Sequence, residues 1–161
     1  MFDKNWNNSP VIDSDIVQSI TNNDLLVSLF RKFPSFENAE ISEFLFTRGN
    51  TLDCMNGIID WKDRIGPTLL VDLMVPLDDC GINEIVRVKI RFSDIDRFCL
   101  NGLNHQNVIC GLGVRIYHSD RLLSKMFRVD WGGSALTHQV SLECHSIIIE
   151  EVQKLRKDPC R

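Results

Sequence analysis

The chain has 161 residues, of which 43% are hydrophobic and 25% are charged. This composition is typical of one globular domain spanning residues 1–161, and it excludes a largely disordered chain. No run of about 18 consecutive apolar residues occurs, so the sequence predicts no membrane-spanning helix and no membrane partner.

The net charge of −4 is unevenly distributed. Residues 1–80 carry 6 Lys/Arg and 13 Asp/Glu, whereas residues 81–161 carry 12 and 9. An acidic half argues against a nucleic-acid partner, because phosphates repel carboxylates. It suits a basic protein partner, which opposite charge would steer, or it reflects acidic loops that water solvates.

Residues 1–13 are polar and predict a loose lead-in. They contain no basic start followed by an apolar run, so we expect no secretory signal and a cytoplasmic location. No two cysteines have CxxC spacing, and free buried thiols in a reducing compartment are expected rather than disulfides. The six cysteines are Cys54, Cys80, Cys99, Cys110, Cys144 and Cys160.

Residues 14–33 predict one or two helices. Ser14 and Asp15 are suitable N-terminal caps for a first helix. A second helix is expected from Leu25 to Phe33, where apolar residues recur at helical spacing. Pro34 should end it, because the residue before a proline is disfavoured in the α region.

After Pro34 the apolar period changes to two, which is typical of strands with one buried face. The segment 84–92 alternates most clearly, and 93–107 is expected to be mostly connection with a short strand near 98–100. An interruption at 147–149 indicates a bulge or burial on both faces. The other expected strands are 41–47, 69–75, 108–117, 127–131 and 140–145.

These elements predict an α+β fold with one or two N-terminal helices packed on a twisted antiparallel β-sheet of about six strands. The sheet should occupy residues 37–150. Residues 151–161 are expected to form a charged tail, with a frayed helix from Glu150.

The sequence contains no recognisable catalytic or cofactor-binding motif, so we expect neither an enzyme nor a bound cofactor or metal. The glycine pairs at 111–113 and 132–133 do not lead into a helix, as phosphate-binding loops must. Cys144 and His145 are adjacent on a strand and therefore point to opposite faces, which prevents them from sharing a metal ion.

Two features have more than one interpretation. Asp94 and Asp96 could serve as an acid–base pair in a pocket with His105, which would make the chain a small-ligand binder or an enzyme, or they could be solvated turn residues. Trp61 is flanked by charges in a long loop, where it would anchor a partner or pin the loop to the core. Trp131 is in phase with Phe127 and is expected in the core.

Five segments of the chain, in order, resemble the immunity protein 50 family, one of the families of bacterial polymorphic-toxin immunity proteins. Where the family has a His-Asp pair, this chain has Glu37-Asn38, so any chemistry of that pair is not expected here. The segments are 33–41 (FPSFENAEI), 91–95 (RFSDI), 103–109 (LNHQNVI), 127–129 (FRV) and 142–144 (LEC).

The resemblance implies that the protein binds a cognate toxin domain in the cytoplasm and blocks it by occlusion, without catalysis. Acidic loops at 50–66 and 76–84 are the expected contact surface, since their carboxylates would complement a basic toxin. The oligomeric state, monomer or homodimer, is left open. The predicted toxin-binding residues are Asp53, Asp60, Trp61, Asp63, Asp78, Asp79 and Glu84.

Overall fold

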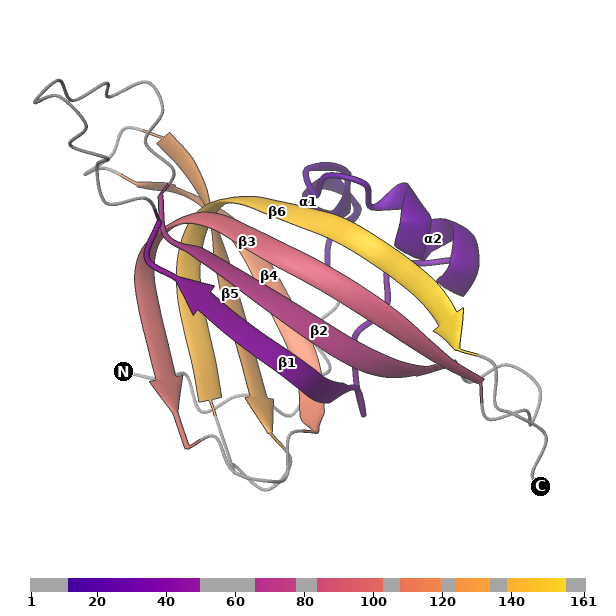
Figure 1. The fold of residues 1–161 in the computed structure, drawn as a ribbon. Helices are drawn as coiled ribbons and strands as arrows, with labels where there is room; N and C mark the ends of the chain where they lie inside the picture. The colour runs from indigo at the N-terminus through magenta and orange to yellow at the C-terminus, as the bar shows by residue number, and fades with distance from the viewer. Residues whose placement is uncertain are drawn as a thin grey trace, which may run out of the picture.

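The computed structural model describes residues 12–49, 66–77, 84–102, 108–119, 124–133 and 139–155. In these residues, two short helices precede six antiparallel strands, which confirms the expected α+β class with a six-stranded sheet (Figure 1). The helices are α1 (Ser14–Gln18) and α2 (Asp24–Phe30). The strands are β1 (Glu40–Thr47), β2 (Thr68–Leu77), β3 (Glu84–Asn101), β4 (Ile109–Ser119), β5 (Ser124–Gly133) and β6 (Gln139–Leu155).

The strand order is β1-β2-β3-β6-β5-β4, which places the long strands β3 and β6 at the centre. The first half of β3 pairs with β2, and its second half extends beyond the end of β2. The first half of β6 pairs with β5. The sheet therefore has two halves that share the β3–β6 pair, and in Figure 1 it is strongly twisted and coiled.

On both central strands, β3 and β6, the alternation of buried and exposed residues shifts by one position, and the two shifts lie opposite each other. On β3 the buried positions pass from Phe92 to Ile95, and on β6 they pass from Cys144 to Ile147. Phe92 lies opposite Ile147 and Ile95 lies opposite Cys144, so both shifts form one corner of the sheet. Asp94 at this corner has φ 53°, a left-handed conformation. The bend brings the inner faces of the two halves together around one hydrophobic core.

The two edge strands of the sheet, β1 and β4, are connected by the segment that precedes β1. The backbone N–H of Asn38 donates to the carbonyl of Ile109 at 2.9 Å, and that of Ile109 donates to Ala39 at 2.8 Å. An isolated antiparallel bridge joins Glu40 and Val108. Residues 35–40 thus cover the beginning of β4, while β1 beyond Glu40 pairs only with β2 among the described strands.

The helical segment forms one bridge with the sheet and adds buried side chains to the core. Thr21, between α1 and α2, forms a parallel bridge with Ile148 of β6. The side-chain amide of Asn22 donates to the carbonyl of Ile149 at 3.1 Å. Ile20 and Leu26 are fully buried, so the helical segment shields the part of β6 that lies beyond β5.

Four local predictions are wrong. The second helix ends at Phe30 rather than Phe33, because Arg31 adopts a left-handed φ of 62° and closes it. Residues 93–101 continue β3 through the corner instead of forming a connection. Residues 151–155 belong to β6, where Glu151 pairs opposite Lys89, so the charged tail and frayed helix do not begin at Glu150.

The fourth concerns the cysteines. Cys99 and Cys110 are free, as expected, but they are exposed. Cys99 lies on the outer face of β3 opposite Ser141. A register shift between Ile109 and Leu112, where Gly111 has φ 147°, buries Ile109 in place of Cys110. Cys144 and Trp131 are buried as predicted.

Candidate partner-binding surface

Most of the predicted toxin-binding residues lie outside the described part of the chain. Residues 50–65 contain Asp53, Asp60, Trp61 and Asp63, and residues 78–83 contain Asp78 and Asp79. Glu84 is described at the start of β3, where its carboxylate lies 3.4 Å from Nζ of Lys154. The structure therefore places only one of the seven residues, in a partly exposed ion pair.

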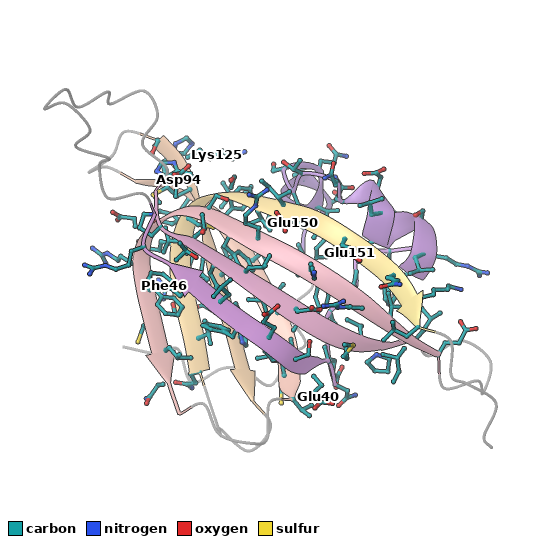
Figure 2. All side chains as sticks on the ribbon, in the orientation of Figure 1. Glu40, Phe46, Asp94, Lys125, Glu150 and Glu151 are labelled. Carbon is teal, nitrogen blue, oxygen red and sulfur yellow. The ribbon has the colours of Figure 1, made fainter. Side chains whose placement is uncertain are left out.

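The small-ligand alternative involves the corner of the sheet. Asp94 and Asp96 are both exposed on β3, and His105 lies outside the described residues. An ideal Cβ on Gly66 would lie 3.2 Å from Cα of Asp94 and closer still to its Oδ1. The N–H of Ile95 donates to the carbonyl of Pro67 at 3.0 Å. Asp94 thus has a structural part in the corner, beside the start of β2 (Figure 2).

Three of the four large apolar side chains that are exposed among the described residues lie on β1 and at the end of β3. Leu45 is 52% exposed, Phe46 39% and Leu100 38%. The ring of Phe98 is half-buried beneath Phe46, with ring centroids 5.1 Å apart. We call Leu45, Phe46, Phe98 and Leu100 the edge patch; Phe46 and Phe98 stack on the inner face, whereas Leu45 lies on the outer face of β1. Figure 2 shows Phe46 on β1 near the corner of the sheet.

The edge patch is connected to the core through aromatic contacts. Phe44 lies 5.9 Å from Phe98 and 6.4 Å from Trp131, measured between ring centroids. Trp131 in turn stacks on the fully buried Phe92 at 5.9 Å. These rings join β1, β3 and β5 across the inner face. Phe46 is consequently held by packing at the surface, and a held side chain loses less conformational entropy when a partner binds.

β1 is much more open than its neighbour. Six of its eight residues are exposed, whereas β2 has no exposed residue. Edge strands expose backbone N–H and C=O groups that can pair with another chain, and proteins often protect them with lysine or proline. β1 contains neither residue, although it carries Glu40 and Glu43 and a bulge between Ile41 and Glu43.

The outer face of the neighbouring strands is occupied by ion pairs. The basic side chains on the outer face of β3 lie between acidic side chains of β2 and β6. On the β6 side, Lys89 forms an ion pair with Glu151 at 3.4 Å, and Arg91 forms one with Glu150 at 2.7 Å. Glu150 and Glu151 lie on this face of β6 in Figure 2. Mutual pairing leaves these basic side chains less available to a charged partner than the exposed side chains of β1 are.

One of these pairs contains a buried carboxylate. Nε of Arg87 donates to Oδ2 of Asp72 at 2.8 Å, and Asp72 is only 1% exposed. Hydrogen bonding to Asp72 raises the pKa of Arg87 above its ordinary value. Oδ1 of Asp72 has no hydrogen-bond partner among the described groups. The carboxylate therefore depends on Arg87 for the compensation of its charge.

Two other groups have raised pKa values. Burial raises the pKa of the Cys144 thiol to about 12, and the nearby charge of Asp94 acts in the same direction. Burial also raises the pKa of Tyr117 to about 12, and the neighbouring carboxylate of Glu143 acts in the same direction. A thiol with so high a pKa is protonated at neutral pH and is a poor nucleophile.

Within the described ranges, no three His, Cys, Asp or Glu side chains are grouped so that they could hold a metal ion. Neither described helix is long and apolar enough to cross a membrane. Comparisons of the chain with protein-family models, with curated proteins and with solved structures found no match.

Sequence reasoning missed the edge patch, although a signal was present. Phe44, Leu45 and Phe46 are three consecutive apolar residues in a strand whose earlier residues are mostly polar. Successive residues point to opposite faces, so such a run makes both faces apolar. Whether the strand is central or at an edge depends on pairing with distant residues, which this local pattern does not reveal.

Proposed function

We propose that the protein is an immunity protein that binds a cognate toxin domain and blocks it by occlusion, in the cytoplasm and without catalysis. The observation that carries the proposal is the edge patch, which consists of exposed aromatic and aliphatic side chains of the edge strand β1 and of the end of β3. Aromatic anchors held in a well-packed surrounding are typical of the centres of protein interfaces. The toxin as partner comes from the resemblance of the five sequence segments.

Two of those segments lie side by side. Residues 35–39 of the first segment exchange backbone hydrogen bonds with residues 109–112, at the end of and just after the third segment. Phe36 and Ala39 of the first segment are fully buried. These residues therefore support the β1 and β4 edges structurally, which leaves toxin contact to the exposed side chains of β1.

The charge around the edge patch agrees with a basic partner surface. Glu40 and Glu43 are exposed on β1, and Arg48 follows the strand. The predicted acidic loops at 50–66 and 76–84 adjoin the ends of β1 and β2 in the sequence. Carboxylates at the rim would steer a basic toxin, and the apolar centre would supply most of the affinity.

Co-expression tests this function. The expected toxin is the C-terminal domain of a large secreted protein encoded immediately upstream of this chain's gene. Cells that produce this domain should grow only when they also produce the wild-type chain. The Leu45→Ser/Phe46→Ser variant should fail to protect them. Leu25→Ser on α2 is the matched control, because Leu25 is 40% exposed outside the edge patch.

Failure of the wild-type chain to protect would overturn the immunity function. Full protection by the Leu45→Ser/Phe46→Ser variant would leave the function standing and overturn the edge patch as the contact surface. The variants should be compared at equal soluble amounts, since loss of folding would also remove protection.

A further inference from the structure

We propose that the outer face of β1 and β2 binds one arginine side chain of the toxin, whose guanidinium lies between Glu43 and Asp72. The inference rests on the proposed function for the identity of the partner and adds the chemistry by which that partner is recognised. Four positions form the site, since Glu43 and Leu45 on β1 lie opposite Asp72 and Leu70 on β2. We call these four residues the outer square.

The first argument is that two acids lie directly opposite each other. Glu43 is in register with Asp72, directly after the bulge between Ile41 and Glu43. Side chains at such positions begin about 4.5–5.5 Å apart, and like charges there destabilise a sheet. Bulges re-aim side chains and are frequent beside active sites. A cation between the two carboxylates would convert their repulsion into two attractions.

The second argument is a buried acceptor that lacks a donor. Asp72 is only 1% exposed, and its Oδ2 accepts a hydrogen bond from Nε of Arg87 at 2.8 Å. Its Oδ1 is buried as well and accepts no hydrogen bond from the groups that the structure describes. Leaving a buried charged acceptor unsatisfied is costly, so a donor that reaches Oδ1 would be bound favourably. Because Oδ1 is covered, the arriving guanidinium has to displace a neighbouring side chain.

The third argument is an excess of negative charge. The cross-strand row over β1, β2, β3 and β6 consists of Glu43, Asp72, Lys89 and Glu151. With Arg87, three carboxylates meet two cations. Lys89 pairs with Glu151 and Arg87 with Asp72, whereas Glu43 makes no ion pair with any residue that the structure describes. The unbalanced charge therefore lies at Glu43, where a partner can supply one cation.

The fourth argument is the apolar half of the outer square, which favours arginine. Leu45 is 52% exposed and lies opposite Leu70, beside the two acids on the same face. The aliphatic stem of an arginine covers apolar surface while its charged head binds a polar group. The guanidinium presents five donors in one plane, so it can bond to both Glu43 and Asp72. An ammonium group is a compact point charge and lacks this planar fork.

Titration calorimetry with the purified toxin domain tests the site. Glu43→Gln should weaken binding at least about tenfold, because a charge-assisted hydrogen bond is lost. Glu37→Gln is the matched control, since it removes the same charge at an exposed position before β1 and should leave the affinity unchanged. Arg→Ala variants of the toxin's surface arginines then identify the partner. One of them should weaken binding to the wild-type chain but have little further effect on Glu43→Gln.

Urea denaturation of the chain without toxin separates a binding role of Glu43 from a structural one. Glu43→Gln removes the repulsion from Asp72, and the new amide can donate to Oδ1. It also removes an attraction to Arg87, whose pKa Glu43 helps to raise. We expect the first two effects to outweigh the third, since Arg87 keeps its direct bond to Asp72. The denaturation midpoint should therefore equal or exceed that of the wild-type chain.

Tight toxin binding that Glu43→Gln does not weaken would overturn the inference and leave the proposed function intact. A lowered denaturation midpoint of Glu43→Gln would also overturn it, because Glu43 would then serve the fold. The same holds if Glu43→Gln is additive with every arginine variant of the toxin. A wild-type chain that does not bind the toxin would overturn the proposed function and the inference with it.

Discussion

The ring of Phe46 stacks on the ring of Phe98, with centroids 5.1 Å apart and planes inclined by 13°. Phe46 is an exposed residue near the end of β1, and Phe98 lies on β3 beyond the corner of the sheet. This contact joins the edge strand to the second half of the sheet, where β2 no longer runs. It therefore fixes the edge patch as a defined surface rather than a loose end of a strand.

The stack should matter more for binding than for stability. Phe46→Ser removes a ring that is 39% exposed, so we expect a loss of about 1 kcal/mol in the free energy of unfolding. Phe92→Ala removes a ring that is 1% exposed in the same aromatic series and should cost about 3–5 kcal/mol. Urea denaturation measures both. Equal losses would show that Phe46 is a core residue and would contradict its assignment to a binding surface.

Gly66→Ala should destabilise the corner of the sheet. Its Cβ would lie 3.2 Å from Cα of Asp94, a backbone atom that cannot move away without shifting β3. Overpacking of this kind costs about 1–3 kcal/mol. Thr68→Ala, two residues along the chain, is the control and should cost less. A Gly66→Ala variant with the wild-type denaturation midpoint would refute the close contact.

The free energy of unfolding should fall in alkaline solution partly through Cys144 and Tyr117. The pKa of Cys144 is raised from 9.0 to about 12 in the folded chain, so the folded state retains the proton more strongly than the unfolded state. This contribution is fully present below about pH 9 and is lost as the pH rises toward about 12. For Tyr117 the corresponding window runs from 10.0 to about 12.

Thermal melts between neutral pH and strongly alkaline pH measure this effect. Cys144→Ala should lower stability at neutral pH through lost packing but flatten the decline above about pH 9. Tyr117→Phe should flatten the upper part of the same decline. An unchanged slope in both variants would mean that other groups control alkaline unfolding.

Removing Arg87 alone should destabilise the protein more than replacing both members of the Asp72–Arg87 pair. Arg87→Met leaves the buried Asp72 carboxylate without its partner and should lower the denaturation midpoint markedly. The double variant Asp72→Asn/Arg87→Met removes the charge as well and should recover part of the loss. Lys89→Met, on the same face in a more exposed pair, is the control. A double variant less stable than Arg87→Met would refute this account.

Periodicity in the sequence predicted the sheet because each strand carries its own alternation. The rows of Val86, Val88 and Ile90 inward and Arg87, Lys89 and Arg91 outward identify β3 locally. The number of strands, their antiparallel pairing and the N-terminal helices follow from such patterns and from turn residues.

Features that depend on contacts between distant segments were not predictable in this way. The phase change at Ser93 and Asp94 resembles the end of a strand, and only pairing with β6 shows that β3 continues. Glu150 and Glu151 resemble a solvated tail until their partners Arg91 and Lys89 are known. The edge patch depends on the strand order, which the sequence pattern does not encode locally.

The role of the acidic loops at 50–66 and 76–84 in toxin binding stays a prediction. Reversing Asp60, Asp63, Asp78 and Asp79 to Lys should slow association with a basic toxin and reduce the salt dependence of its rate. Stopped-flow binding at two ionic strengths measures both. Association that is unaffected by the reversal would remove the loops from the contact surface.

The most direct test of the central claim is the affinity of the purified toxin domain for the chain and for its Leu45→Ser/Phe46→Ser variant. Titration calorimetry should show tight binding to the wild-type chain. The double variant should bind at least about 100-fold more weakly, because it removes two central apolar contacts. Equal affinity for both chains would contradict binding through the edge patch, and no binding to the wild-type chain would contradict the toxin as partner.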